Sequence, residues 1–349
     1  MFIKYLKLIL FYLFMLLAII FFLWSKLLIV SLLLVFLIDT ITLQMFSRFL
    51  KKRLSKDLFI VLKYFYAIFS IIFVALFCRV FLFEIYFIPS SSMERTLSKG
   101  DIVVVNKLEY GPKVPNKLSD IPFGNLFNKT NEKQKKINPQ NVRLKGFDDI
   151  RRNDIIVFER PIKHKKLIKR IIGLPGETLK IVNSKVFIND SFLEEKPNYV
   201  FEYNYKAVEF KDNTFTLSNI EYENSNFEDK IERTIHFPKK KVDHIFPKEK
   251  IFDWNRDNYG SVTIPKEGVS ITLDLKSIYL YKDIIEFETG KKINIDINEI
   301  HINKEKLTKY SFKDDYFFVM GDNRHYSSDS RSIGFVSQNS IQGKLAFKF

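Results

Sequence analysis

The sequence predicts a mainly β protein, in which N-terminal transmembrane helices precede a large β-rich domain. Residues 1–88 of the 349-residue chain are almost continuously apolar, whereas the remainder has the composition of a soluble protein. From Asp101 onward the apolar residues come mostly in short runs of strand length. No long amphipathic helix is evident after residue 100, and many strands without long helices favour a β-rich domain.

Three apolar stretches are candidates for membrane-spanning helices, because a span needs about 20 apolar residues. They are residues 5–24, residues 27–46 and residues 58–78. Asp39 weakens the second stretch, and the third qualifies if Lys63 reaches the nearer membrane interface. The sequence therefore predicts a membrane anchor over residues 1–78 with three spans, or with two if Asp39 prevents the second. The apolar N-terminal run is too long for a cleavable signal peptide and has no small-residue cleavage site.

Basic residues gather near residues 47–57, between the second and third apolar stretches. Basic residues beside helix ends favour the cytoplasmic side of a membrane. The last span is therefore expected to run outward, so that residues 79–349 form an extracytoplasmic β-rich domain. Two or three spans give the same placement, because the final crossing sets it. Ser92 follows the apolar run by about a dozen residues, which is at most roughly 45 Å of extended chain.

The net charge of +15 raises the question of a nucleic-acid partner. The chain has neither zinc-ligand spacing nor a phosphate-binding glycine loop, and a basic domain beside an anionic lipid bilayer is the simpler interpretation. We therefore expect the bilayer as a partner, and no nucleic acid. No metal or organic cofactor is implied. The single cysteine, Cys78, excludes an intramolecular disulfide.

The soluble part is predicted to contain several short strands and two insertions. The strands are expected at residues 102–105, 154–158, 179–182 and 185–188, the last two as a hairpin with Asn at the turn. The insertions, at about residues 112–147 and 197–260, are rich in polar residues and have no clear strand pattern.

Ser92 and Lys169 are the residues whose neighbourhoods point to chemistry. A serine hydroxyl needs a neighbouring base to act as a nucleophile, and none of the five histidines lies in a sequence typical of a histidine-based triad. In a strand, Lys169 would share a face with Leu167 and Ile171, and an apolar environment lowers the pKa of a lysine towards the working range of a base. From this stretch alone, a solvated lysine at a strand edge stays an open alternative.

A third polar cluster covers residues 319–331, with the sequence Val-Met-Gly-Asp-Asn-Arg-His-Tyr-Ser-Ser-Asp-Ser-Arg. Its groups could position a lysine, or could form an ordinary hydrogen-bonded turn. Together the clusters resemble the sequence boxes of bacterial type I signal peptidases, the membrane-bound serine/lysine proteases. The matching segments are residues 88–97, 152–158, 169–176 and 321–331, with Arg79 and Glu84 before the first of them.

The resemblance implies roles for individual residues. Ser92 matches the nucleophile, Lys169 the general base, and Ser90 the hydroxyl that completes the oxyanion hole with the backbone N–H of Ser92. The other matches are Ser327 as the lysine-orienting serine, Asp329 and Arg331 as a supporting ion pair, and Tyr86, Ile88 and Ile168 as the lining of shallow substrate pockets.

The resemblance also implies an activity and a location. It implies removal of signal peptides from exported preproteins through an acyl-enzyme, by a multi-pass protein of the bacterial inner membrane whose catalytic domain faces outward. Partners would be signal peptides and the lipid bilayer, with the secretion translocon as a further candidate. The implied fold is a large antiparallel β domain with an apolar surface that rests on the membrane.

Some positions depart from the family pattern. Arg95 stands where proline is usual, Ser91 and Asn153 where glycine is common, and His325 and Tyr326 where an Asp-Asn pair is common. These departures leave substrate preference open, and they leave open a divergent or inactive paralogue that acts as a membrane-anchored scaffold. A penicillin-binding or β-lactamase-type enzyme is disfavoured, because no serine here precedes a lysine by three positions. A self-cleaving repressor is also disfavoured, because such a protein would lack the membrane segments.

Overall fold

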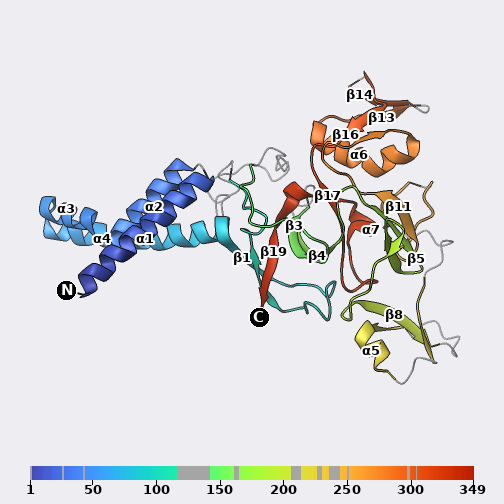
Figure 1. Cartoon of the computed structure of the whole chain (residues 1–349), viewed down its shortest axis with the longest axis horizontal. Helices are drawn as coiled ribbons and strands as arrows, with labels where there is room; N and C mark the ends of the chain where they lie inside the picture. Colours follow the sequence, from blue (N-terminus) through green and yellow to red (C-terminus); the bar gives the residue numbers. More distant parts are fainter. Residues whose placement is uncertain are drawn as a thin grey trace. The chain divides into compact units, whose positions relative to one another are not determined.

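Two units make up the part of the chain that the structure, a computed structural model, describes (Figure 1). The described residues are 2–25, 27–41, 44–115, 142–160, 165–205, 214–225, 230–235, 244–249, 251–296, 299–303 and 305–349. The first unit contains the described residues up to Phe83, together with residues 111–115 and 142–147. The second contains residues 84–110 and the described residues from Asp148 onward.

The first unit is helical. Its elements are α1 (Phe2–Ser25), α2 (Leu28–Ile41), α3 (Met45–Arg53), α4 (Lys56–Phe77) and the π-helical turn η1 (Cys78–Leu82). Among the described residues, only Lys56–Leu82 is a helical stretch long and apolar enough to cross a membrane, and Ile9–Leu23 and Val30–Asp39 are shorter apolar helices. Side chains along α4 such as Phe65 and Ile71 are about 70% exposed, which is the surface expected of a helix that faces lipid.

The predicted stretch over residues 27–46 is not one helix. The second helix ends at Ile41, and α3 begins at Met45 after Gln44, which has a left-handed backbone. The carboxylate of Asp39 accepts a hydrogen bond from the backbone N–H of Phe46, and so holds the start of α3. The same aspartate that interrupts the apolar sequence therefore accompanies the break between the two helices.

The second unit is built on a seven-stranded sheet in the order β1-β2-β19-β3-β4-β17-β18 (Figure 1). The strands are β1 (Phe83–Phe87), β2 (Ile102–Asn106), β3 (Ile155–Glu159), β4 (Lys166–Gly173), β17 (Tyr316–Met320), β18 (Val336–Ser337) and β19 (Ile341–Lys348). All pairings from β2 to β18 are antiparallel. The prediction of a mainly antiparallel β fold is confirmed.

The sheet is curled, and register shifts along β19 contribute to its curvature. The register of β19 shifts against β3 between Ile341 and Gly343, and against β2 between Leu345 and Phe347. Such bulges bend a strand and increase its twist. Gly343 also permits the close approach of β2, because a Cβ atom there would lie 2.4 Å from the backbone oxygen of Asn106.

The curl brings together strands that are not neighbours in the sheet. Glu84 on β1 is bonded to Lys166 on β4, with 2.9 Å between Nζ and Oε1. Because the serine segment follows β1 and Lys169 lies on β4, the same curvature positions the two halves of the candidate site.

Smaller sheets complete the second unit. The sheet β11-β5-β6-β7 is formed by Tyr259–Thr263, Thr178–Val182, Lys185–Ile188 and Ser191–Phe192. The sheet β10-β8-β9 is formed by Ile231–Arg233, Val200–Tyr205 and Phe215–Ser218. The pair β12-β16 is formed by Ser270–Thr272 and Lys309–Ser311, and β13-β14-β15 by Ile293–Asp296, Glu299–Ile302 and Glu305–Lys306. The predicted hairpin over residues 179–188 is confirmed, with Asn183 and Ser184 both at positive φ in its turn.

The expectation of no long helix after residue 100 was wrong. Helix α6 runs from Leu275 to Thr289 and buries Ile278, Ile284 and Ile285 in the largest hydrophobic cluster. Asp274 and Ser277 form a capping box at its start, and Gly290 ends it in the left-handed conformation. These start and stop signals are readable in the sequence.

The structure describes the two predicted insertions to different extents. Residues 116–141 of the insertion at 112–147 lie outside the described residues. The described parts of residues 197–260 form β8, β9, β10 and the short helix α5 (Asn219–Glu223), and they end in β11, which pairs with β5.

The capping box of α6 gives a stability prediction. Replacing Asp274 with alanine removes the acceptor for the Ser277 N–H, at a cost of about 1 kcal/mol. We expect the thermal midpoint of the detergent-solubilised chain to fall by about 2–4 °C. Asp283→Ala, at an exposed position in the middle of the same helix, is the matched control and should shift the midpoint little. Equal shifts for the two variants would contradict the assigned cap.

Candidate active site

Ser92 lies in a tight turn that follows β1. The turn is closed by backbone hydrogen bonds from Glu94 N to Ser91 O and from Leu97 N to Met93 O, at 3.0 and 2.7 Å. Met93 and Leu97 are completely buried, which anchors the turn in the protein. Ser92 itself is buried, so its hydroxyl is held in a fixed surrounding rather than in a free loop.

Lys169 projects from β4, where its backbone pairs with Ile156 of β3. Its Nζ lies 2.6 Å from Ser92 Oγ and 2.7 Å from the backbone oxygen of Ile168. The side chain is 3% exposed. Burial lowers the pKa of Lys169 from 10.5 to about 8, against the opposing effect of the carboxylates of Asp329 and Asp322.

The loop after β17 holds the serine turn from behind. Asn323 donates from its backbone N–H to Ser92 O at 3.2 Å and from its side-chain amide to Ser91 O at 3.1 Å. A Cβ atom at Gly321 would lie 2.5 Å from Ser92 O and 2.2 Å from Ser327 Oγ. Only glycine therefore allows the loop to pack this closely behind the nucleophile candidate.

A buried ion pair connects the lysine strand to this loop. Arg170 binds Asp322 through Nε and Nη2, at 2.8 and 2.6 Å from the two carboxylate oxygens. The hydroxyl of Thr96, at the end of the serine turn, donates to the same carboxylate at 2.6 Å. Asp322 thus holds the serine turn, the lysine strand and its own loop together, which residue spacing alone does not reveal.

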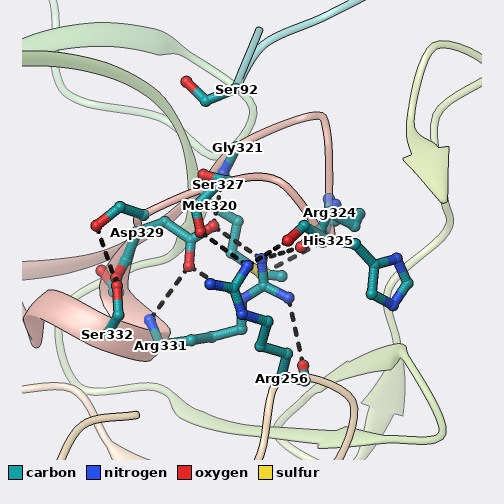
Figure 2. Close-up of polar contacts among 12 residues, drawn as sticks. Ser92, Arg256, Met320, Gly321, Arg324, His325, Ser327, Asp329, Arg331 and Ser332 are labelled. Carbon is teal, nitrogen blue, oxygen red and sulfur yellow. Dashed lines mark hydrogen bonds and ion pairs between the residues drawn. The ribbon is translucent and has the colours of Figure 1, made fainter. Parts of the chain in front are cut away.

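Asp329 and Arg331 form a second buried ion pair, shown in Figure 2. Their contacts measure 3.0 Å from Nε to Oδ1 and 2.8 Å from Nη2 to Oδ2. Burial alone would raise the pKa of Asp329, but Arg331 holds it below the usual value. Asp329 also accepts from the N–H of Gly321, and Arg331 donates to the backbone oxygen of Arg324 at 2.5 Å. The pair therefore fixes both ends of the loop behind Ser92.

The structure does not bring Ser327 into a hydrogen bond with Lys169. The Ser327 hydroxyl is buried and has no partner of ordinary hydrogen-bond geometry among the described residues. It lies against Gly321 and close enough to Asp329 to contribute to lowering the pKa of that carboxyl. Its role as the lysine-orienting serine stays a prediction.

Ser90 lies beside Ser92 and is exposed. Its hydroxyl is 3.3 Å from Ser92 Oγ. Among the described residues no group uses the backbone N–H of Ser92, so this N–H and the Ser90 hydroxyl are both available to an incoming oxygen atom. The role of these two groups as the donors of an oxyanion hole stays a prediction.

The three residues expected to line substrate pockets lie in one apolar cluster beside the serine turn. Ile88 is buried and Tyr86 and Ile168 are partly buried. The other members are Met93, Leu97, Val103, Ile155 and Leu345.

An ionic group at the edge of this cluster was missed from the sequence. Glu84 is bound by Lys107 at 2.8 Å and by Lys166 at 2.9 Å. Although burial opposes it, the two ammonium groups hold the pKa of Glu84 at about 2. Lys166 also lies 3.1 Å from the hydroxyl of Tyr86. No local pattern links residues so far apart in the sequence.

Two departures from the family pattern have backbone consequences. Arg95 has φ +66°, which a proline ring cannot adopt, so the usual proline could not occupy this turn. Asn153 has φ +75°, and asparagine is among the residues that tolerate this region best after glycine. Within the described chain, no group of three or more His, Cys, Asp or Glu side chains is placed to hold a metal ion.

The sequence of the chain is similar to those of known proteins. The family model described as signal peptidase, peptidase S26, matches residues 61–262 and 268–349. The signal peptidase I of Buchnera aphidicola subsp. Baizongia pistaciae is 28% identical over 82% of this chain and 76% of its own. That of Buchnera aphidicola subsp. Acyrthosiphon pisum is 31% identical over 80% of this chain and 71% of its own.

A solved signal peptidase I from Enterococcus faecalis V583 is 23% identical and covers 57% of this chain and 98% of its own, with a TM-score of 0.24. The family match extends over both the serine and the lysine segments as well as the loop behind them. The chain therefore belongs to the signal peptidase family, peptidase family S26.

Proposed function

We propose that Ser92 and Lys169 carry out the hydrolysis by which this signal peptidase removes signal peptides from exported preproteins. The observation that supports the proposal is the 2.6 Å approach of a buried lysine amine to a serine hydroxyl. At pH 7 a lysine of pKa about 8 is neutral in about one molecule in ten, against about one in 3,000 for a pKa of 10.5. Burial therefore supplies a base at neutral pH.

Acylation begins when neutral Lys169 accepts the hydroxyl proton of Ser92. Ser92 Oγ then attacks the scissile carbonyl carbon and forms a tetrahedral intermediate. The intermediate collapses as its C–N bond breaks, and the Lys169 ammonium gives its proton to the leaving amine. The mature protein departs with a free amino terminus, and the signal peptide stays as an ester on Ser92.

Deacylation repeats these steps with water. Neutral Lys169 takes a proton from a water molecule, whose oxygen attacks the ester carbon. The bond from this carbon to Ser92 Oγ breaks, and the proton returns from Lys169 to the serine oxygen. Throughout, the Ser92 N–H and the Ser90 hydroxyl stabilise the negative oxygen of the intermediate.

Substrate selection and location follow from the same proposal. The apolar cluster that contains Tyr86, Ile88 and Ile168 would accept small apolar residues near the cleavage point. The protein is membrane-associated like its family. We propose a multi-pass arrangement in a bacterial inner membrane with the catalytic unit outside. The apolar helices and the basic last turn of α3 support this topology, and it would place the enzyme within reach of the translocon and of membrane-inserted preproteins.

The first test removes the nucleophile or the base. Ser92→Ala and Lys169→Ala are each expected to lower kcat/KM for a purified preprotein in detergent by at least about 1,000-fold. Lys185→Ala, at an exposed position in the β5–β6 hairpin, is the control and should cleave like the wild type. A wild type that does not cut would favour the scaffold alternative, and an active Lys169→Ala would exclude the lysine as base.

The pH dependence tests the protonation state. Only the neutral amine can accept the serine proton, so kcat/KM should rise as the pH increases through about 8 and then level off. This rising part of the pH profile of kcat/KM, the pH limb, is measured with a preprotein whose cleavage site lacks titratable residues. An inflection near 10.5, as for a solvated lysine, would contradict the proposed role of burial.

The oxyanion hole gives a graded effect. Ser90→Ala removes one of two donors, which is worth about 3 kcal/mol, or a loss of about 100-fold in kcat. Ser91→Ala is the matched control, because Asn323 contacts only the backbone oxygen of Ser91. Kinetics of the two variants on one preprotein make the comparison. Ser90→Ala activity within about twofold of the wild type would remove Ser90 from the mechanism.

A further inference from the structure

A small lobe inside the second predicted insertion is attached directly to the segments that hold Ser92. We define the lobe as residues 197–205, 214–225 and 230–235. It contains the sheet β10-β8-β9 and helix α5, and these elements lie in the yellow-green part of Figure 1. Its own core is formed by Tyr199, Phe201, Tyr203 and Ile231. A lobe with its own core can act as a rigid support for what it contacts.

The first attachment joins β8 to the loop behind Ser92. Val200 N donates to Asp322 O, and Arg324 N donates to Val200 O, both at 2.9 Å. These two bonds flank Asn323, the residue that holds the backbone oxygens of Ser91 and Ser92. The lobe is therefore bonded to both neighbours of the residue whose contacts fix the serine turn.

The next residues of the loop strengthen this attachment. The backbone N–H of Glu202 donates to His325 Nδ1 at 3.1 Å, and the hydroxyl of Tyr326 donates to Glu202 Oε2 at 3.1 Å. His325 is held from its other side by Asp257, 3.1 Å from Nε2. His325 and Tyr326, two of the departures from the family pattern, thus both contact the lobe at Glu202.

The second attachment joins α5 to the serine turn itself. Arg95, three residues beyond Ser92, lies 2.5 Å from Glu221 Oε1. The other carboxylate oxygen of Glu221 accepts from the backbone and hydroxyl of Ser218 in the capping box of α5. The capping box holds the carboxylate of Glu221 in place, whereas the side chain of Arg95 is 51% exposed, so the ion pair lies at the protein surface.

The two attachments enclose Ser92 in a closed set of contacts. The lobe binds the serine turn through Arg95 and binds the loop behind it through Val200 and Glu202, and that loop in turn binds Ser92 through Asn323. We propose that the lobe is a positioning element for the nucleophile, with Glu221 and Glu202 as positioning residues that hold the serine turn against the lysine strand. The proposal rests on the proposed function of Ser92 and Lys169.

The consequences follow from the geometry of the dyad. A nucleophile displaced by a fraction of an ångström from its base loses rate without losing substrate affinity. A loosened serine turn would also admit water to Lys169, whose low pKa depends on burial. A positioning defect should therefore lower kcat, leave KM unchanged, and move the pH limb of kcat/KM to higher pH.

The test uses the full chain in detergent with Glu221→Gln, Tyr326→Phe and the double variant. Glutamine at position 221 can still accept from Ser218, so α5 keeps its cap and only the ion pair with Arg95 is lost. We expect kcat to fall about three- to fivefold in each single variant and further in the double variant, with the pH limb shifted upward. The matched control is Asp190→Asn, which breaks the exposed Lys180–Asp190 pair in the β5–β6 hairpin and should change neither quantity.

A double-mutant cycle tests whether the second attachment acts through the ion pair of Arg95 with Glu221. Arg95→Gln should lower kcat like Glu221→Gln, and the combination should be no worse than either alone. A rise in KM with kcat unchanged would instead make the lobe a substrate-binding surface and overturn the proposal. A lower thermal midpoint with unchanged kcat and pH limb would reduce the lobe to a structural role and would equally overturn it.

Hydrogen exchange separates this proposal from the function on which it rests. In the double variant, amides of residues 91–97 should exchange faster than in the wild type, whereas in Asp190→Asn they should not. This measurement needs no preprotein. Unchanged exchange in the double variant would end the positioning role even if Ser92 and Lys169 are the dyad, and faster exchange in a chain that cuts no preprotein would leave the support intact and reject only the proposed function.

Discussion

The contact between an amine removed from water and a serine hydroxyl is the constraint on which the rest of the second unit depends. An isolated buried ammonium is strongly disfavoured, so Lys169 is neutral far more often than a solvated lysine. That neutrality lasts only while Ser92 and its turn stay packed over Nζ at 2.6 Å. The curl of the main sheet, which brings β1 back to β4, is what makes this packing possible.

The two buried ion pairs around the site serve the same constraint. The carboxylates of Asp322 and Asp329 both raise the pKa of Lys169, and so oppose burial. Each is bound by an arginine, Arg170 or Arg331, which cancels much of its negative charge. Asp322 and Asp329 can therefore hold the loop and the serine turn in place while Lys169 keeps its lowered pKa.

The sequence was sufficient for the β-rich fold class and for the hairpin at residues 179–188, because each leaves a local pattern. The pairing of Ser92 with Lys169 was implied by the family resemblance and not by any local pattern, and the structure places the two side chains 2.6 Å apart. The sequence failed for α6, whose caps were present but whose apolar residues are spread around the helix. The role of Ser327 in orienting Lys169 stays a prediction, and the structure packs the Ser327 hydroxyl against Gly321. The contacts of Glu84 with Lys107 and Lys166, like those of the lobe, join distant residues and leave no spacing to detect.

Three of the five departures from the family pattern, at Arg95, His325 and Tyr326, share one explanation. Arg95 has a left-handed backbone, which proline could not adopt, and its guanidinium contacts Glu221. His325 and Tyr326 both meet Glu202. These three departures thus contact one lobe, Arg95 from the serine turn and the neighbouring His325 and Tyr326 from the loop behind it. A change of support around an unchanged serine and lysine accounts for them more simply than a loss of catalysis, because a chain without catalysis has no need for a tightly held Ser92.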